Sequence, residues 1–258
     1  MTAHPDDLTP NLADDSRIKV IGLGGIGCAV LPYLTVFLKS LGRPVRLVLI
    51  DGDRFEAANG SRMVFQKIGN KAEVKAAEMA ALLGSGDVSV TAVPEYVTAA
   101  NVGRLILPGD HVFLCVDNHP TRKLVSDHCG RLPAVALFSG GNEGVDPPRE
   151  RGTYGNVQVH VRQDGRDATA PLTRFHPEIA NPKGKPPSEM NCTELAVSTP
   201  QILFTNLAVA SAMLNAFFAY LCGRLTYQEV KLDVLDARML PQLPLGPGQV
   251  PAPLPAPA

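Results

Sequence analysis

The sequence has no tryptophan, few aromatic residues and almost no net charge. Aromatic residues make up 5% of the 258 positions, and 24 Lys and Arg nearly balance 25 Asp and Glu, for a formal net charge of −1 at pH 7. Proteins that bind nucleic acid usually carry a marked excess of basic residues, so nucleic acid is not expected as the main partner. With 45% hydrophobic and 19% charged residues, the composition is that of a globular protein with one large or two small domains.

The chain also lacks the cysteine patterns of disulfide-rich and zinc-binding proteins. Its five cysteines are irregularly spaced and include no C-x-x-C pair. This argues against a disulfide framework, fits a reducing cytoplasm and leaves no zinc site to be expected. No apolar run approaches the ~20 residues that span a bilayer, and the polar start has no signal-peptide core, so we expect a cytoplasmic protein without membrane contact.

A glycine-rich run, Ile21-Gly22-Leu23-Gly24-Gly25-Ile26-Gly27, is the most informative segment. Apolar residues precede and follow it, which predicts a strand, a tight turn and a helix. Glycines let the backbone turn sharply and approach a ligand, and the free N–H groups at a helix N-terminus bind phosphate. We therefore expect a nucleotide-phosphate site at Gly22, Gly24, Gly25 and Gly27. The run alone does not identify the nucleotide, and NAD-dependent dehydrogenases commonly carry it.

Strand and helix patterns alternate after this run. Apolar segments predict strands over 46–50, 88–93, 111–116 and 134–138, with helices over 70–83 and 121–132. This order predicts an α/β, Rossmann-like, doubly wound and mostly parallel sheet. Residues 155–161 and 230–235 predict an antiparallel extension, 164–191 a long crossover loop and 200–221 an apolar helix. The expected organisation is a flexible tail over 1–16, one domain over 17–240 and a Pro-rich disordered tail over 241–258.

Candidate ligand-binding residues follow the predicted strand 46–50. An acidic residue at this position, here Asp51, commonly binds ribose hydroxyls, whereas Asp53 either joins it or caps a turn. Asn59 and Arg62 are three residues apart and would share one face of a helical turn. An amide can orient a phosphate oxygen, and an arginine can neutralise charge during phosphoryl transfer. The alternative for Arg62 is an exposed salt bridge.

The helix predicted over 70–83 begins with a charge in an unusual place. Asn70 can cap this helix and Glu73 completes a capping box, which leaves Lys71 in the first turn. The helix dipole disfavours a cation there, and a bound anion would remove the conflict. Lys75 is expected to be a solvated lysine.

A second polar group follows the predicted strand 111–116. Ligands of open α/β sheets lie beyond the carboxyl ends of the strands, which is where Asp117 and Asn118 fall. Asp117 could hold Mg²⁺ on nucleotide phosphates, or it could cap the next helix. Arg122, inside that helix, is expected to be structural.

Together these segments resemble the ThiF/MoeB and ubiquitin-activating enzyme superfamily of adenylyltransferases, from about Arg17 to Leu221. The matching elements are the Gly22–Gly27 loop, Asp51-Gly52-Asp53, Asn59-x-x-Arg62, Gly69-x-Lys71 and Val116-Asp117-Asn118 followed by Arg122. The resemblance makes 17–240 an adenylation domain that uses ATP and Mg²⁺ to activate the C-terminal glycine of a small ubiquitin-like or sulfur-carrier protein. It also indicates a bacterial ubiquitin-like conjugation branch.

Roles follow from the resemblance by position. It implies that Asp51 holds the ribose, that Asn59, Arg62 and Lys71 address the phosphates, and that Asp117 binds the metal. Asn118 and Asp53 belong to the same nucleotide site. Positioning and charge neutralisation then do most of the catalysis, without a general base.

Cysteine use and two departures from the family complete the expectation. Cys192 follows the long polar loop, where the resemblance implies that a cysteine can take the activated carrier; a half-buried structural cysteine is the alternative. Cys28, Cys115, Cys129 and Cys222 are expected to be structural. The family's arginine-bearing helix before the glycine loop and its zinc-binding cysteine pairs are both missing, and Arg17 is the only arginine before the loop.

The sequence therefore predicts an ATP-dependent adenylyltransferase. The resemblance and the apolar helix over 202–221 imply a homodimer. Three alternatives remain: an NAD-dependent oxidoreductase, a non-catalytic partner subunit of an activating enzyme, and an enzyme of the same fold that adenylates a peptide or a tRNA.

Overall fold

The computed structural model describes residues 8–61, 63–146, 150–190 and 201–244, in which strands and helices alternate. The principal strands are β1 (Ser16–Ile21), β2 (Val45–Ile50), β5 (Val88–Val93), β6 (His111–Leu114), β7 (Val135–Asn142), β10 (Tyr154–Gln163), β12 (Glu229–Asp233) and β13 (Arg238–Gln242). The helices are α1 (Gly25–Ser40), α2 (Lys71–Leu83), α3 (Val102–Leu105), α4 (His119–Cys129), α5 (Pro177–Ala180) and α7 (Leu203–Leu221). Short strands pair locally: β3 (Arg54–Phe55) with β4 (Gly69–Asn70), β8 (Val145–Asp146) with β9 (Glu150–Arg151), and β11 (Arg166–Asp167) with β10.

One nine-stranded sheet organises the molecule, in the order β13-β12-β10-β7-β6-β1-β2-β5 with β11 beside β10. Strands β7, β6, β1, β2 and β5 are parallel to their neighbours, whereas β10, β12 and β13 add on as antiparallel strands. The predicted mostly parallel, doubly wound sheet with an antiparallel extension is therefore confirmed.

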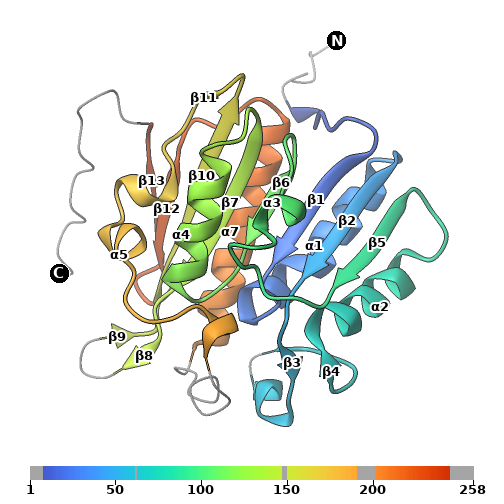
Figure 1. The fold of residues 1–258 in the computed structure, drawn as a ribbon, viewed down its shortest axis with the longest axis horizontal. Helices are drawn as coiled ribbons and strands as arrows, with labels where there is room; N and C mark the ends of the chain where they lie inside the picture. Colours follow the sequence, from blue (N-terminus) through green and yellow to red (C-terminus); the bar gives the residue numbers. More distant parts are fainter. Residues whose placement is uncertain (1–7, 62, 147–149, 191–200, 245–258) are drawn as a thin grey trace.

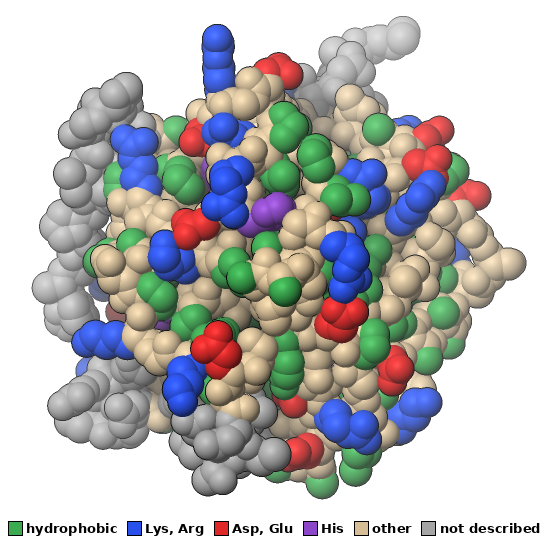
Figure 2. All heavy atoms as spheres, viewed as in Figure 1, with side chains coloured by type: hydrophobic (Ala, Val, Ile, Leu, Met, Phe, Trp, Pro, Cys, Tyr) green, Lys and Arg blue, Asp and Glu red, His purple; other side chains and the backbone are tan. Residues whose placement is uncertain are grey.

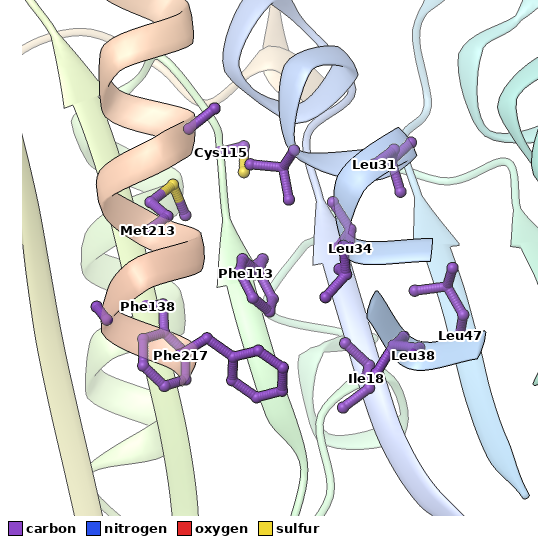
Figure 3. Packing of buried hydrophobic residues seen from close by; sticks show 14 of the residues in the cluster. Ile18, Leu31, Leu34, Leu38, Leu47, Phe113, Cys115, Phe138, Met213 and Phe217 are labelled. Carbon is purple, nitrogen blue, oxygen red and sulfur yellow. The ribbon is translucent and has the colours of Figure 1, made fainter. Parts of the chain in front are cut away.

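Helices cover both faces of this sheet and bury a core on each (Figure 1). Helices α1 and α7 pack on one face, where Phe113, Phe138, Phe217 and Met213 meet between the strands and α7 (Figure 3). The rings of Phe113 and Phe217 are 5.2 Å apart, edge to face. Helices α3 and α4 cover the other face over a second cluster. Such burial on both faces explains why the parallel strands read as continuous apolar runs.

Helix α7 corrects the estimate that no apolar run approaches a membrane-spanning length. By length and composition alone, this 19-residue helix could cross a membrane. In the fold it contacts α1, β7 and β10, and its buried side chains include Val209, Met213 and Phe217. A helix that packs in a protein core can be as long and as apolar as a membrane-spanning helix. The contacts of α7 with α1, β7 and β10 therefore account for its apolar sequence.

The domain boundaries differ from the prediction at both ends of the described chain. Leu12 is buried in the core and Asn11 N–H donates to the Leu221 carbonyl, so the chain is attached to the body already at residues 11 and 12, within the predicted tail. At the other end β13 continues to Gln242. The predicted crossover loop contains short helical turns over 172–174, 177–180 and 187–189, and buries Leu172 and Ile179. Its last residue, 191, lies outside the described residues.

In the turn between β1 and α1, neighbouring backbone leaves no room for a side chain at two of the glycines. Gly22 has a positive φ of 87°, and a Cβ there would lie 2.9 Å from the backbone of Cys115 and Val116 beyond β6. A Cβ on Gly27 would lie 2.1 Å from the Gly22 carbonyl oxygen. By contrast, the nearest atom to a Cβ on Gly24 is 3.9 Å away, on Met63. Packing therefore demands glycine at 22 and 27, whereas space lies open at 24.

We expect two matched glycine substitutions to differ in stability. Gly27→Ala should lower the free energy of unfolding by about 3 kcal/mol, because the new methyl group meets backbone that cannot rotate away. Gly24→Ala should cost less than about 1 kcal/mol, the scale of a weakened helix N-cap. Urea denaturation of both variants measures the difference. Equal losses would contradict the packing described for this turn.

Candidate functional site

The glycine loop, Asp51, Lys71 and Asp117, all predicted to bind a nucleotide, lie where the strand order reverses. Strands β1 and β6 are neighbours, yet the chain leaves β1 toward β2 on one side and returns to β6 on the other. Crevices at such a point, beyond the carboxyl ends of the strands, are where open α/β sheets bind ligands. In Figure 1 this is the lower edge of the sheet, where β3 and β4 also lie.

The glycine loop ends in a helix N-terminus without a side-chain cap. Helix α1 begins at Gly25 after Gly24, no side chain of the described residues caps it, and its first turn holds no acidic residue. The first N–H groups of a helix have no partner within it, and they carry the positive end of the helix dipole. This end of α1 can accept an anion such as phosphate.

Asp51 ties the glycine loop to the segment after β2. One carboxylate oxygen of Asp51 accepts a hydrogen bond from Leu23 N–H at 2.6 Å, and the other accepts from Asp53 N–H at 2.8 Å. Burial raises the pKa of Asp51, whereas Lys71 and the two N–H donors lower it. Each oxygen keeps a second lone pair, which leaves Asp51 able to accept from a ligand hydroxyl as well.

Lys71 is buried within this group of acids. Its Nζ lies 2.5 Å from Asp53 Oδ2, and only 9% of the lysine side chain is exposed, against 49% for Asp53. Burial lowers the pKa of Lys71, but the charges of Asp51 and Asp53 outweigh it and hold the pKa above its ordinary value. The acids thus stabilise the cation that sequence reasoning found misplaced at the start of α2.

The start of α2 has the predicted cap. Asn70 Oδ1 accepts from Glu73 N–H at 3.1 Å, and Asn70 Nδ2 donates to the carbonyls of Asp51 and Asp53 at 3.0 and 3.1 Å. Asn70 therefore joins α2 to the loop after β2 and fixes Lys71 beside Asp53.

Asp117 and Asn118 have separate roles at the end of β6. Asn118 caps α4, because its side-chain oxygen accepts a hydrogen bond from Thr121 N–H at 2.9 Å. The alternative prediction that Asp117 is the cap is therefore wrong. Asp117 is exposed, and no described residue forms a hydrogen bond or ion pair with it. The charge of Asp117 acts to raise the pKa of both Lys71 and Arg122. Asp117 is thus free to bind a ligand near Lys71.

Arg122 is structural, as expected. Its guanidinium is buried and donates to the carbonyls of Val116 and Gly140, which closes the ends of β6 and β7 on each other. Desolvation lowers the pKa of Arg122, and the charge of Asp117 opposes this.

The second predicted group is only partly described. Asn59 Oδ1 accepts from Glu56 N–H at 2.9 Å and so holds its own turn, η2 (Ala57–Ser61). Arg62 and Cys192 lie outside the described residues, so their predicted roles stay predictions. Arg17 lies at the opposite edge of the sheet, where its guanidinium pairs with Asp110 and donates to the Pro108 carbonyl.

Three of the cysteines expected to be structural are buried. Burial raises the pKa of Cys28 to about 11, and those of Cys115 and Cys129 to about 12, so these thiols stay protonated near neutral pH. Cys222 is only half-buried, at the C-terminal end of α7.

Sequence reasoning missed an amide cluster beside the glycine loop. Asn206 is fully buried at the start of α7, and its Oδ1 accepts from Asn142 Nδ2 at 2.9 Å. A Cβ on Gly25 would lie 2.2 Å from Asn206 Nδ2, so Gly25 is required by this contact. The only signal in the sequence is the Thr205-Asn206 pair within an apolar helix.

The donors present suit Mg²⁺ that arrives with a nucleotide. Among the described residues, no three His, Cys, Asp or Glu side chains gather where they could hold a metal ion by themselves. Mg²⁺ usually takes one or two carboxylates and completes its shell with phosphate oxygens and water. The exposed carboxylate of Asp117 meets that requirement.

Comparison with known proteins gives relatives that are named adenylyltransferases. The chain is 34% identical over 127 residues to the SAMP-activating enzyme E1 of Haloferax volcanii, which covers 48% of this chain and 45% of that protein. It is 27% identical over 190 residues to the molybdopterin-synthase adenylyltransferase of Escherichia coli, covering 73% and 67%. It is 37% identical over 116 residues to the bovine adenylyltransferase and sulfurtransferase MOCS3, covering 44% and 24%. The match thus spans less than half of the first and third relatives.

Solved structures share the fold. The crystal structure of E. coli MccB with succinimide superposes with a TM-score of 0.64 at 17% identity, over 92% of this chain and 65% of that one. The structure of MccB with ATP gives 0.63 at 17% identity, over 94% and 67%. The names of the sequence relatives agree with the predicted enzyme class, and the model of the ThiF family matches residues 8–241. The chain therefore belongs to the ThiF family.

Proposed function

We propose that this chain is an ATP-dependent adenylyltransferase that activates the C-terminal carboxylate of a small ubiquitin-like or sulfur-carrier protein. The observation that carries the proposal is the convergence of the bare α1 N-terminus, Lys71 and Asp117 on one crevice at the switch point of the sheet. The names of the relatives support the same reaction class.

The chemistry fits a site made of cations, amides and acids. The carrier carboxylate attacks the α-phosphorus of ATP in line, the bond to the bridging oxygen breaks, and pyrophosphate leaves. No proton is transferred, so no general base is required, and catalysis rests on positioning and charge stabilisation. Mg²⁺ held by Asp117 would neutralise charge on the phosphates.

Lys71 is suited to exchange partners during this reaction. Its present partner, Asp53, is half-exposed and can be hydrated when Lys71 turns toward a phosphate. Asp51, which stays bonded to Leu23 N–H, would hold the ribose through its remaining lone pairs. Asn59 and Arg62 complete the phosphate contacts in this proposal.

We predict that Lys71→Ala and Asp117→Ala each reduce carrier-dependent ATP–pyrophosphate exchange by about 100-fold or more, the scale of losing one charge-stabilising group. The assay uses a small carrier protein that ends in Gly-Gly. Lys123→Ala is the matched control, because Lys123 is half-exposed on α4 and pairs with Asp127. Thermal unfolding verifies that each variant is folded.

The same experiment separates the alternatives. The absence of ATP–pyrophosphate exchange with any cognate carrier, together with NADH binding tighter than Mg-ATP in a fluorescence titration, would support the oxidoreductase. Binding of a carrier without exchange would support a non-catalytic partner subunit. A folded Lys71→Ala variant with full activity would remove that residue from the site.

Cys192 is proposed as the acceptor of the activated carrier. Its thiolate would attack the acyl carbon of the adenylate, forming a thioester and releasing AMP. We predict that Cys192→Ala keeps ATP–pyrophosphate exchange but yields no thiol-sensitive adduct with the carrier by mass spectrometry. Loss of exchange in a folded variant would instead indicate a structural role, and an adduct that persists would place the transfer on another residue.

A homodimer is supported by the outer faces of α1 and α7. These helices lie side by side over one sheet face, and α7 carries no charged residue. Apolar side chains stay exposed on both: Tyr33 and Val36 on α1, and Leu203, Phe204 and Leu207 on α7. An exposed apolar layer of this kind marks an interaction surface, and a second copy of the chain is the partner that the family resemblance implies.

We predict that Phe204→Glu, which changes a side chain that is 69% exposed, shifts the protein to a monomer while leaving it folded. A buried carboxylate at the interface has no partner, so association should weaken by more than tenfold. Sedimentation velocity gives the mass. A wild-type chain that sediments as a monomer would exclude the homodimer.

The remaining expectations concern location and other partners. We propose a cytoplasmic protein that does not act on nucleic acid. Figure 2 is consistent with the second part, because basic and acidic side chains are interspersed over the one face that it shows.

A further inference from the structure

Lys75 is a buried cation in a place where the sequence predicts a solvated lysine. It lies one helical turn after Lys71 on α2 and is 3% exposed. Its Nζ donates to Glu78 Oε2 at 2.6 Å and to the Val64 carbonyl at 2.5 Å. A buried ammonium is stable only where a counter-charge and hydrogen-bond acceptors replace water, and both are present here.

These contacts hold the segment that follows Arg62 in the chain. Glu78 uses its other oxygen, Oε1, to accept from Gln66 N–H at 2.8 Å. Between these two attachments the ring of Phe65 stacks on Phe55 at 4.5 Å. Residues 64–66 are therefore fixed to α2 by a charged pair and to β3 by an aromatic stack.

The two lysines face one ring but differ in their partners. The Nζ atoms of Lys71 and Lys75 lie 5.9 and 5.8 Å from the centre of the Phe55 ring. The partner of Lys71 is half-exposed, whereas Glu78 is 10% exposed. Lys71 can exchange Asp53 for a phosphate, but Lys75 has no solvated partner to release and bonds the backbone as well. Only Lys75 is built as a permanent attachment.

We propose that Lys75, with Glu78, is a positioning residue for nucleotide binding. It fixes residues 64–66 and thereby the neighbouring Met63, whose side chain lies beside Gly24 of the glycine loop. This inference rests on the proposed function, because it requires that the glycine loop binds ATP phosphates.

The test is a comparison of Mg-ATP and adenosine binding. Lys75→Met preserves the apolar stem and removes the charge, and should weaken Mg-ATP binding by about tenfold, as expected for loss of hydrogen bonds to a charged group. Adenosine has no phosphate, so its affinity should change less than about twofold. Lys75→Arg should recover part of the Mg-ATP affinity. Lys123→Met is the matched control on an exposed lysine. Isothermal titration measures Mg-ATP, and ligand-observed NMR measures adenosine.

If the wild-type chain binds no Mg-ATP, the proposed function is wrong, and the role of Lys75 that rests on it is wrong as well. If it does, unchanged Mg-ATP affinity in Lys75→Met, or equal losses for Mg-ATP and adenosine, overturns the positioning role. If Lys75→Met does not fold, the double variant Lys75→Met/Glu78→Gln, which leaves no unpaired charge, replaces it under the same criteria.

Discussion

The carboxylate of Asp51 is the interaction on which the candidate site depends. It joins the glycine loop after β1 to the segment after β2 through Leu23 N–H and Asp53 N–H. Both loops belong to parallel neighbouring strands, so a side chain at the end of one strand can reach the backbone of the other. This bridge helps to fix the N-terminus of α1 relative to Lys71, together with the contacts of Asn70 to the loop after β2.

Charge is arranged around this bridge in two layers. Asp51, Asp53 and Asp117 surround Lys71, and Lys75 and Glu78 form a separate buried pair one turn further along α2. Burial of a lone lysine would favour its neutral form, and the acids reverse that preference at Lys71. The layer next to the crevice includes half-exposed acids that a ligand can replace, whereas the inner pair is closed to solvent and holds backbone. In our proposal, the group around Lys71 binds the ligand, whereas the Lys75–Glu78 pair holds the backbone in place.

The sheet and its helices bring segments that are distant in the sequence to the glycine loop, and a few residues make the contacts. Gly22 and Gly27 let α1 approach β1 and the end of β6, and Arg122 closes β6 on β7. The helix after the crossover region then places Asn206 against Gly25. Residues more than 180 positions apart therefore meet at one loop, which makes the C-terminal half of the chain part of the nucleotide site in our proposal.

The sequence by itself determined the sheet, the glycine turn and the cap at Asn70, because apolar periodicity, glycine and capping chemistry act between residues close in the chain. Only the tertiary structure decided which polar groups are paired. Asn118 caps α4 in place of Asp117, Lys75 is buried with Glu78, and Asn206 contacts the glycine loop. Polar composition near the start of the chain did not reveal the burial of Leu12. Burial and hydrogen-bond partners depend on segments distant in sequence, and local pattern carries no information about them.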